Sequence, residues 1–382
     1  MTITFFSNYM NIHQLPFCEE LMKHIGTENF KFVSTRQMDS DRVQMGFEDM
    51  NVTKPFVVRE YEDEVGRKEA HRLAIDSDVV IFGSAPTSYL NERMRLNKLA
   101  FKYNERILKR GDWMYFHPAI QRQIRKTFTD NNNKDLYVLC ASAYTKRDLS
   151  LFGFPGEKCF KWGYFPEVKH YDSYEQVVAS KKTALKRPGV SILWAGRLIG
   201  WKHPEVPVYV AKQLRKKGIN FELNMIGEGP ERERTAMLIA KNHLEDFVHL
   251  LGAKEHDFVL EMMEKSDIFL FTSDRNEGWG AVLNEAMNAG CAVVANKAIG
   301  SVPFLIEDGK SGLMYSSQKE SVEKIMYLIG KEGEIQRLGK RAKEATSNVW
   351  SIENATANLM TLIEELSNGD KITNKKGPCS RA

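Results

Sequence analysis

Residues 268–285 read Ile-Phe-Leu-Phe-Thr-Ser-Asp-Arg-Asn-Glu-Gly-Trp-Gly-Ala-Val-Leu-Asn-Glu. The apolar run Ile268–Ser273 is typical of a strand that is buried on both faces of a parallel sheet. Gly278 and Gly280 allow a tight turn, and a helix is predicted to start near Ala281. Because the first N–H groups of a helix have no intrahelical acceptor, this turn predicts a site for an anionic group.

Two carboxylates flank this glycine-rich turn. Glu277 precedes it and could accept hydrogen bonds from sugar hydroxyls, whereas Glu285 lies one helical turn further on, where it could bond ribose hydroxyls. The alternative is a pair of unrelated surface carboxylates. The glycines between them and the strand before them favour a common site.

Two further strand-to-helix turns have related features. After the predicted strand Ser191–Gly196, the loop carries Arg197 and Lys202, two cations that suit a diphosphate, although either could be an ordinary surface charge. The segment Met225-Ile-Gly-Glu-Gly-Pro-Glu231 places Gly227 and Gly229 after a strand and before a helix, where the backbone can approach a ligand closely.

Strands and helices alternate along most of the 382 residues, which is too long a chain for one hydrophobic core. The first half predicts the strands Ile3–Ser7, Phe30–Ser34, Phe56–Arg59, Val79–Gly83 and Leu136–Ser142, with helical patterns at Leu15–Ile25 and Tyr89–Lys109. The second half predicts Ser191–Gly196, Phe221–Gly227, Val248–Leu251, Ile268–Ser273 and Ala292–Asn296. We therefore expect two α/β domains with parallel sheets, separated by a linker at Gly163–Pro188.

The composition excludes several classes of protein. Hydrophobic residues make up 42% and charged residues 27%, and no run of 18 apolar residues predicts a membrane-spanning helix. The five cysteines are scattered and odd in number, so a disulfide framework or zinc site is not expected, and a cytoplasmic location is. The N-terminus reads as a first strand and not as a signal peptide.

The three motifs together resemble one family. Glu277 to Glu285 form an E-x(7)-E motif, and residues 273–294 resemble the signature of family 4 (group 1) retaining glycosyltransferases. The segments Ala-Gly-Arg-Leu-x-x-x-Lys, ending at Lys202, and Ile-Gly-Glu-Gly-Pro, ending at Pro230, are similar to the same family in the same order. The resemblance is strong over residues 190–315 and faint over the first domain.

The resemblance implies the GT-B fold, in which two Rossmann-like domains face a cleft. It assigns residues 1–166, with a returning helix at 350–366, to acceptor binding and residues 167–349 to the nucleotide-sugar donor. Residues 367–382 are polar and are expected to be disordered. The implied reaction is metal-independent sugar transfer with retention of configuration, of the hexosyltransferase type, from a nucleotide-diphosphate sugar, with a UDP-sugar expected over a GDP-sugar and no other cofactor.

Individual roles follow from the resemblance. Arg197 and Lys202 would hold the diphosphate and stabilise the leaving group, while Glu277 would bond the donor sugar and Glu285 the ribose. The other donor-binding residues that we predict are Gly196, Gly227, Gly252, Ala253, Gly278, Trp279, Gly280, Ala281 and Val282. The rings of Trp194, Trp201 and Trp279 could also stack on a base or a sugar, although Trp194 fits the core of a strand.

The first domain departs from the family pattern. The loop after the first strand, Phe6-Ser-Asn-Tyr-Met-Asn-Ile-His-Gln14, lacks the glycines found in many members. His13 is our candidate residue there because it follows the first strand, with a structural histidine as the alternative. Ser84 and Ser142 occupy similar positions after later strands.

Positive charge is concentrated at residues 93–126, which contain ten Lys or Arg residues against Glu105 and Asp112. A solvated helix face explains this equally well as a surface for an anionic membrane or a phosphate-bearing acceptor. Nucleic acid is not expected, because no nucleic-acid motif accompanies the charge. The pair Asp76 and Asp78 resembles a metal-binding D-x-D motif but precedes a strand, so we interpret it as a turn and expect no metal.

The predicted function is sugar transfer to a saccharide or lipid-linked acceptor in cell-surface polysaccharide or glycolipid synthesis, with peripheral attachment to the inner face of the membrane. Two alternatives remain. One is a nucleotide-sugar epimerase or hydrolase on the same fold, and the other is a non-catalytic subunit that binds nucleotide sugars.

Overall fold

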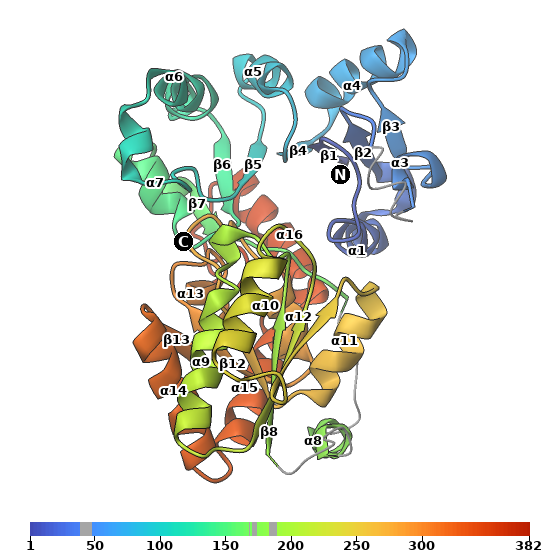
Figure 1. Cartoon of the computed structure of the whole chain (residues 1–382). Helices are drawn as coiled ribbons and strands as arrows, with labels where there is room; N and C mark the ends of the chain where they lie inside the picture. The colour runs from blue at the N-terminus through green and yellow to red at the C-terminus, as the bar shows by residue number, and fades with distance from the viewer. Residues whose placement is uncertain (39–47, 168, 170–173, 183–188) are drawn as a thin grey trace. The chain divides into compact units, whose positions relative to one another are not determined.

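The computed structural model describes residues 1–38, 48–167, 169, 174–182 and 189–382. The chain forms two compact units, Met1–Pro166 with Ile352–Ala382, and Glu167–Ser351 (Figure 1). The predicted domain limits are 166 and 349, against 166 and 351 in the structure. Among the described residues, no helix is both long and apolar enough to cross a bilayer.

The described part of the first unit contains a parallel sheet of seven strands in the order β3-β2-β1-β4-β5-β6-β7. Its strands are β1 (Ile3–Ser7), β2 (Phe30–Ser34), β3 (Val57–Arg59), β4 (Val79–Phe82), β5 (Ala100–Asn104), β6 (Leu136–Cys140) and β7 (Cys159–Lys161). The strand order reverses between β1 and β4. In open parallel sheets such a reversal creates a crevice at the carboxyl ends of the strands, where ligands bind.

Helices cover this sheet and bury its apolar residues, among them Phe6, Val80 and Phe82. They are α1 (Leu15–Ile25), η1 (Thr27–Asn29), α3 (Met50–Thr53), α4 (Glu64–Asp76), α5 (Thr87–Arg95), η2 (Asp112–Phe116), α6 (Pro118–Thr127), η3 (Thr129–Asn131), α7 (Thr145–Leu151), η4 (Gly156–Lys158) and α16 (Ile352–Asn368). Asp76 ends α4 and Val79 begins β4, so the Asp76–Asp78 segment is the turn that the sequence predicts.

The helical pattern predicted for Tyr89–Lys109 is wrong beyond Arg95. The chain leaves the helix at Leu96, passes through Asn97 with a φ of 51°, and enters β5. Ala100 and Phe101 are fully buried because β5 pairs with both β4 and β6. Pairing with strands distant in sequence therefore overrides the local helical periodicity.

The described part of the second unit contains a six-stranded parallel sheet in the order β10-β9-β8-β11-β12-β13. Its strands are β8 (Val190–Ala195), β9 (Phe221–Ile226), β10 (Val248–Gly252), β11 (Ile268–Phe271), β12 (Ala292–Asn296) and β13 (Leu313–Tyr315). The five strands predicted above lie within one or two residues of β8, β9, β10, β11 and β12. Two parallel-sheet, Rossmann-like units confirm the predicted α/β fold.

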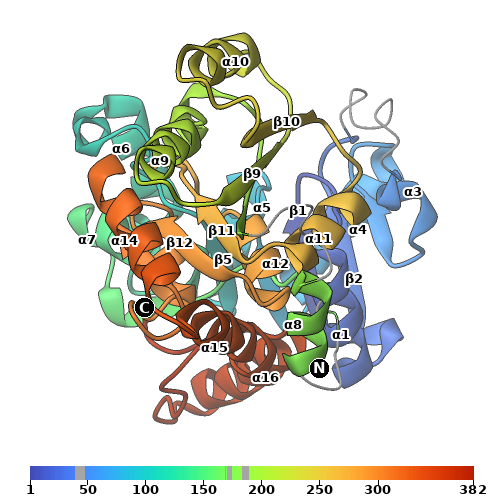
Figure 2. The same cartoon turned by 60° about the horizontal axis from the view of Figure 1, so that its bottom comes forward.

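The helices of the second unit lie on both faces of its sheet. They are α8 (Tyr174–Lys182), η5 (Gly200–Lys202), α9 (Glu205–Lys216), α10 (Arg232–Lys241), α11 (His256–Lys265), α12 (Val282–Asn288), α13 (Val302–Leu305), α14 (Gln318–Gly330) and α15 (Glu334–Asn348). Figure 2 shows α9, α10 and α14 on one side and α11, α12 and α15 on the other. Helix α8 lies inside the predicted linker, where Lys181 donates a hydrogen bond to the Ser266 carbonyl at 2.6 Å.

The C-terminal tail is ordered, which corrects the prediction of disorder. Cys379 and Ala382 donate backbone hydrogen bonds to Lys161 and Cys159 at 2.8 and 3.0 Å, and Arg381 forms an antiparallel bridge with Phe160. The tail thereby covers β7, the edge strand of the first sheet. A free strand edge presents unpaired N–H and C=O groups, and the tail satisfies those of β7. The polar composition of the tail does not reveal this pairing, which is why the sequence predicted disorder.

Candidate functional site

Three loops at the carboxyl ends of β8, β9 and β10 are joined through their backbones. The Gly196 N–H donates to the Ile226 carbonyl at 3.0 Å, and the Leu198 N–H to the Glu228 carbonyl at 2.8 Å. The Gly227 N–H donates in turn to the Gly252 carbonyl at 2.8 Å. These bonds bring together three of the glycines that the sequence predicts to contact the donor.

Two glycines are required for this close approach. A Cβ on Gly227 would lie 1.9 Å from the Gly196 carbonyl oxygen, and one on Gly229 would lie 2.4 Å from the Leu198 carbonyl oxygen. Both also have a positive φ, of 140° and 153°. Side chains here would force the loops apart. The Gly-Glu-Gly motif therefore first serves to hold the neighbouring cation-bearing loop in place.

Lys202 and Glu277 form an ion pair from two different loops. The Lys202 Nζ lies 2.6 Å from the Glu277 Oε2, and each side chain is 13% exposed. The Ser273 hydroxyl donates to the same carboxylate oxygen at 2.9 Å. Because both donors use Oε2, the other oxygen, Oε1, has no partner among the described residues. One oxygen of Glu277 is thus fixed and the other is available to a ligand.

Arg197 differs from Lys202 although both come from the same loop. Its side chain is exposed, and within the described parts of the chain no carboxylate lies at ion-pair distance from it. The charge of Lys202 is already balanced by Glu277. The free cation of this loop is therefore Arg197.

The sequence analysis missed His203, which follows Lys202 in a left-handed conformation with a φ of 51°. Its Nδ1 lies 2.9 Å from the Glu205 Oε1 and its Nε2 lies 3.4 Å from the Asp274 Oδ2. The hydrogen bond with Glu205 raises the pKa of His203 above its ordinary value. A positive φ in a non-glycine residue is not visible in a single sequence, so no sequence signal marks this position.

The glycine-rich turn is shaped by packing against the core. Gly280 has a φ of 85°, and a Cβ there would lie 2.5 Å from the Phe271 ring. Ala281 and Val282 follow at the start of α12, where first-turn N–H groups have no intrahelical acceptor. Gly278 is buried beside them.

Trp279 cannot stack on a ligand, which corrects the idea that its ring binds the donor. Its side chain is 1% exposed, its ring centroid lies 5.8 Å from that of Trp350, and its indole N–H donates to the Asn284 Oδ1 at 2.9 Å. Only its backbone remains a predicted donor contact. Trp194 is also buried, as the sequence predicts.

Glu285 is 9% exposed, and His256 at the start of α11 lies beside it, with 3.2 Å between the His256 Nε2 and the Glu285 Oε1. Burial raises the pKa of the Glu285 carboxyl, and the neighbouring histidine opposes this. The sequence analysis did not select His256. Gly252 and Ala253 lie just before it, and Ala253 is exposed.

The first unit contains a separate cavity of about 370 Å³ at the reversal of its strand order. Residues after β1 line it, namely Ser7, Asn8, Asn11 and Gln14. Gly83 and Ser84 after β4, the segment 102–106 around the end of β5, and Tyr164 complete the wall. Almost every lining side chain is polar, so the cavity suits a ligand with many hydroxyl groups.

The structure places the three candidates of the first unit differently. Ser84 is part of the cavity wall, whereas His13 is not, although its neighbours Asn11 and Gln14 are. The His13 ring lies beside Tyr164, with 6.1 Å between centroids. Ser142 is fully buried, and its hydroxyl accepts a hydrogen bond from the Tyr144 N–H at 3.3 Å.

Three of the ten cations at residues 93–126 point into the unit, so the predicted basic surface is smaller than the sequence suggests. Arg93 is fully buried and donates to four backbone carbonyls, of Ala74, Ser77, Asp78 and Leu99. Lys102 lines the cavity, and Arg106 is 8% exposed. The sequence alone does not distinguish basic residues on an exposed helix face from basic residues whose side chains point into the unit.

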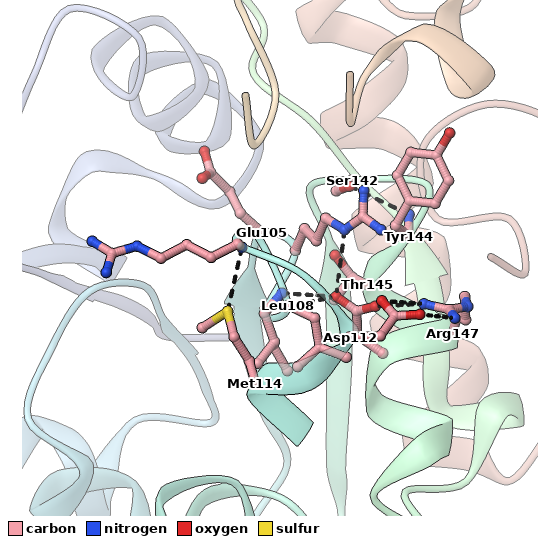
Figure 3. A network of polar contacts seen from close by, with 12 residues as sticks. Glu105, Leu108, Asp112, Met114, Ser142, Tyr144, Thr145 and Arg147 are labelled. Carbon is pink, nitrogen blue, oxygen red and sulfur yellow. Dashed lines mark hydrogen bonds and ion pairs between the residues drawn. The ribbon is translucent and has the colours of Figure 1, made fainter. Parts of the chain in front are cut away.

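The remaining basic surface includes exposed aromatic side chains. In η2, Trp113 is 59% and Phe116 75% exposed. Figure 3 shows how this segment is attached: Asp112 pairs with Arg147 of α7, with 2.7 Å between the Asp112 Oδ2 and an Arg147 Nη. The segment thus presents its aromatic rings from a fixed position.

Comparison with known proteins places these features in context. Residues 178–345 match the family profile of the group 1 glycosyl transferases. An uncharacterized glycosyltransferase of Methanocaldococcus jannaschii is 33% identical over 40% of this chain and 42% of its own length. The putative colanic acid biosynthesis glycosyltransferase WcaL of Salmonella typhimurium is 33% identical over 34% of this chain and 33% of its own length.

Among solved structures, the Anabaena protein HepE in complex with UDP aligns over 96% of this chain and 100% of its own, with a TM-score of 0.70 and 16% identity. The curated relatives match over less than half of their length, while the structural match covers nearly the whole chain. The chain therefore has the GT-B fold, and its residues 178–345 match the group 1 glycosyl transferases.

Proposed function

We propose that this protein is a retaining glycosyltransferase that uses a nucleotide-diphosphate sugar bound by its second unit. The observation that supports this best is the Glu277 carboxylate. Lys202 and Ser273 hold one of its oxygens, and the other faces no donor among the described residues. A carboxylate fixed in this way can accept a bond from a hydroxyl of the donor sugar in one defined orientation.

Arg197 supplies the free positive charge in this proposal. As the bond between sugar and diphosphate breaks, negative charge grows on the leaving group, and a nearby guanidinium stabilises it. Lys202 comes from the same loop as Arg197. Its ammonium pairs with the Glu277 carboxylate and orients it. The N–H groups at Ala281 and Val282 add hydrogen-bond donors for the phosphate.

The nucleotide would be held by Glu285 and by the backbone at Gly252 and Ala253. Two ribose hydroxyls are suitable donors to a buried carboxylate, and His256 keeps one oxygen of Glu285 in place. The known complex of HepE with UDP supports UDP as the nucleotide. We propose that transfer needs no metal ion.

The acceptor would be a saccharide or a lipid-linked saccharide. The relative named for colanic acid biosynthesis supports a role in polysaccharide synthesis. The polar cavity of the first unit offers hydrogen-bonding groups for such an acceptor.

The reaction can be tested by incubating the protein with UDP-sugars and a panel of saccharides in the presence of a metal chelator. The account expects UDP release that depends on the saccharide, with the product keeping the donor's anomeric configuration by NMR. Product of inverted configuration would disprove retention. Loss of all turnover with chelator, restored by magnesium, would disprove metal independence.

The same assay separates the alternatives. An epimerase or hydrolase would convert the UDP-sugar at full rate without a saccharide. A non-catalytic subunit would bind UDP-sugar and turn over none of it with any saccharide of the panel.

We also propose that the first unit contacts an anionic membrane through Trp113, Phe116 and the cations of α6. Aromatic rings and basic side chains together favour the interface of a negatively charged bilayer. Sedimentation with phosphatidylglycerol vesicles should show binding that salt weakens and that the pair Trp113→Ala and Phe116→Ala removes. Met237→Ala, at an exposed residue of the second unit, should have no effect. Binding that is unchanged in the double variant would exclude this surface.

A further inference from the structure

The cavity of the first unit contains a cation whose charge is not balanced. The Lys102 Nζ donates to the carbonyl of Gly83, and both residues belong to the cavity wall. Among the described residues, no carboxylate lies at ion-pair distance from this ammonium. Burial alone lowers the pKa of Lys102 to about 8.

The other charges at this cavity are already compensated. The Glu105 carboxylate accepts a bond from the Tyr164 hydroxyl at 2.9 Å and pairs with the Lys109 Nζ at 2.5 Å. Figure 3 shows the Glu105 side chain directed away from the pair of Asp112 and Arg147.

Arg106, the second cation of the wall, has its own counter-charge. Its Nε lies 3.8 Å from the Oδ2 of Asp148, whose side chain is fully buried, and its guanidinium lies over the Tyr144 ring at 4.3 Å. The same Asp148 oxygen accepts the N–H groups of Ile107 and Leu108 at 3.0 and 2.9 Å. The charge left over at the cavity is therefore that of Lys102.

We propose that the ligand of this cavity is an acidic saccharide, whose phosphate or carboxylate group pairs with the Lys102 ammonium. A partly buried ammonium without a counter-charge costs free energy, and an anion from the ligand would reduce this cost. The hydroxyls of Ser7 and Ser84 and the amides of Asn8, Asn11 and Gln14 would bond the sugar hydroxyls. The inference rests on the proposed function, and it narrows the acceptor to one that bears a negative charge.

The test is a calorimetric titration of the full chain, first saturated with UDP, with glucose, glucose 6-phosphate and glucuronate. At least one charged sugar should bind about tenfold more tightly than glucose, as expected for a hydrogen-bonded ion pair. The phosphate and the carboxylate arms show which anion fits. If neither charged sugar binds more tightly than glucose, the inference is wrong, and this comparison needs only the unmodified protein.

Variants locate the effect. Lys102→Met should remove the preference for the charged sugar, and Lys102→Arg should retain part of it. Lys98→Met is the matched control, because the Lys98 Nζ also donates to a backbone carbonyl, that of Ile75 at 2.8 Å, but lies outside the cavity. A preference that survives in Lys102→Met would overturn the assignment.

Failure of the inference can be distinguished from failure of the proposed function. UDP binding is measured in the first step and depends on the second unit. A protein that binds UDP but shows no preference for acidic sugars contradicts only the inference. A protein that does not bind UDP contradicts the proposed function. In that case the preference for charged sugars, compared between the unmodified protein and Lys102→Met, still tests the inference about the cavity.

Discussion

The loops of the second unit and the cavity of the first unit differ in how their charged side chains are paired. In the second unit Lys202 is matched by Glu277, and Glu285 is accompanied by His256. In the first unit, the partner of Lys102 among the described residues is the Gly83 backbone carbonyl. The second unit therefore holds Lys202, Glu277 and Glu285 in place before any ligand arrives, and Arg197, its cation without a carboxylate partner among the described residues, is exposed to solvent. In the first unit the corresponding cation, Lys102, lies in the wall of a cavity.

The largest expected effect is on the Glu277 carboxylate. Glu277→Gln keeps the shape but weakens both the bond to Lys202 and the acceptor for a sugar hydroxyl, so turnover should fall about 10²–10³-fold. Glu261→Gln, which removes an exposed partner of Lys265 on α11, should leave turnover unchanged. Steady-state rates of UDP release measure both. Full turnover in Glu277→Gln would show that this carboxylate is not part of the site.

The joined loops of the second unit predict a large effect on stability. Gly227→Ala should destabilise the protein by about 3 kcal/mol or more, because its Cβ would overlap the Gly196 carbonyl and its φ is positive. Gly218→Ala also has a positive φ but meets no atom within 4 Å, so it should cost only about 1 kcal/mol. Urea unfolding followed by fluorescence compares the two. Equal losses would mean that contact between the loops contributes nothing.

A smaller effect is expected at His256. His256→Ala removes the partner of Glu285 and should weaken UDP binding by about tenfold, since the carboxylate loses its fixed orientation. Because the histidine opposes the effect of burial, the variant should also raise the pKa of Glu285 further. UDP affinity measured against pH would then weaken at a higher pH than in the unmodified protein. If the UDP affinity and its pH profile are both unchanged in the variant, His256 does not contribute to nucleotide binding.

A further effect concerns the pH dependence of stability. The pKa of Lys102 is about 8 in the folded state, against an ordinary value of 10.5. Between these two values the unfolded chain binds more protons at this residue, so its contribution to stability rises with pH. Lys102→Met should remove this rise, and Lys98→Met should not. Unfolding curves recorded from pH 7 to pH 10.5 on the three proteins test it, and identical curves would indicate a solvated lysine.

The two units also differ in how far the sequence predicts them. The strands of the second unit could be predicted because they are apolar runs, and its candidate site residues Gly227, Glu277 and Glu285 could be selected because they follow those strands. In the first unit, β5 was hidden because Ala100–Asn104 becomes a strand only through pairing with β4 and β6. The position of Lys102 in the cavity wall could not be predicted without that strand.

Other parts of the site depend on contacts that no local pattern reveals. The burial of Trp279 follows from packing against Phe304 and Trp350, which lie 25 and more residues away. The approach of His256 to Glu285 depends on where α11 and α12 meet. The sequence indicates which loops are candidates for the site, and tertiary packing decides which side chains within them are exposed.

The central claim is that the second unit binds a nucleotide-diphosphate sugar through Arg197 and Glu277. The most direct measurement is a calorimetric titration of UDP and UDP-glucose into the unmodified protein, Arg197→Ala and Glu277→Gln, without added metal. The account predicts binding of both ligands to the unmodified protein, weakened binding of both to Arg197→Ala, and weakened binding of only UDP-glucose to Glu277→Gln. Equal binding of both ligands to all three proteins would contradict it.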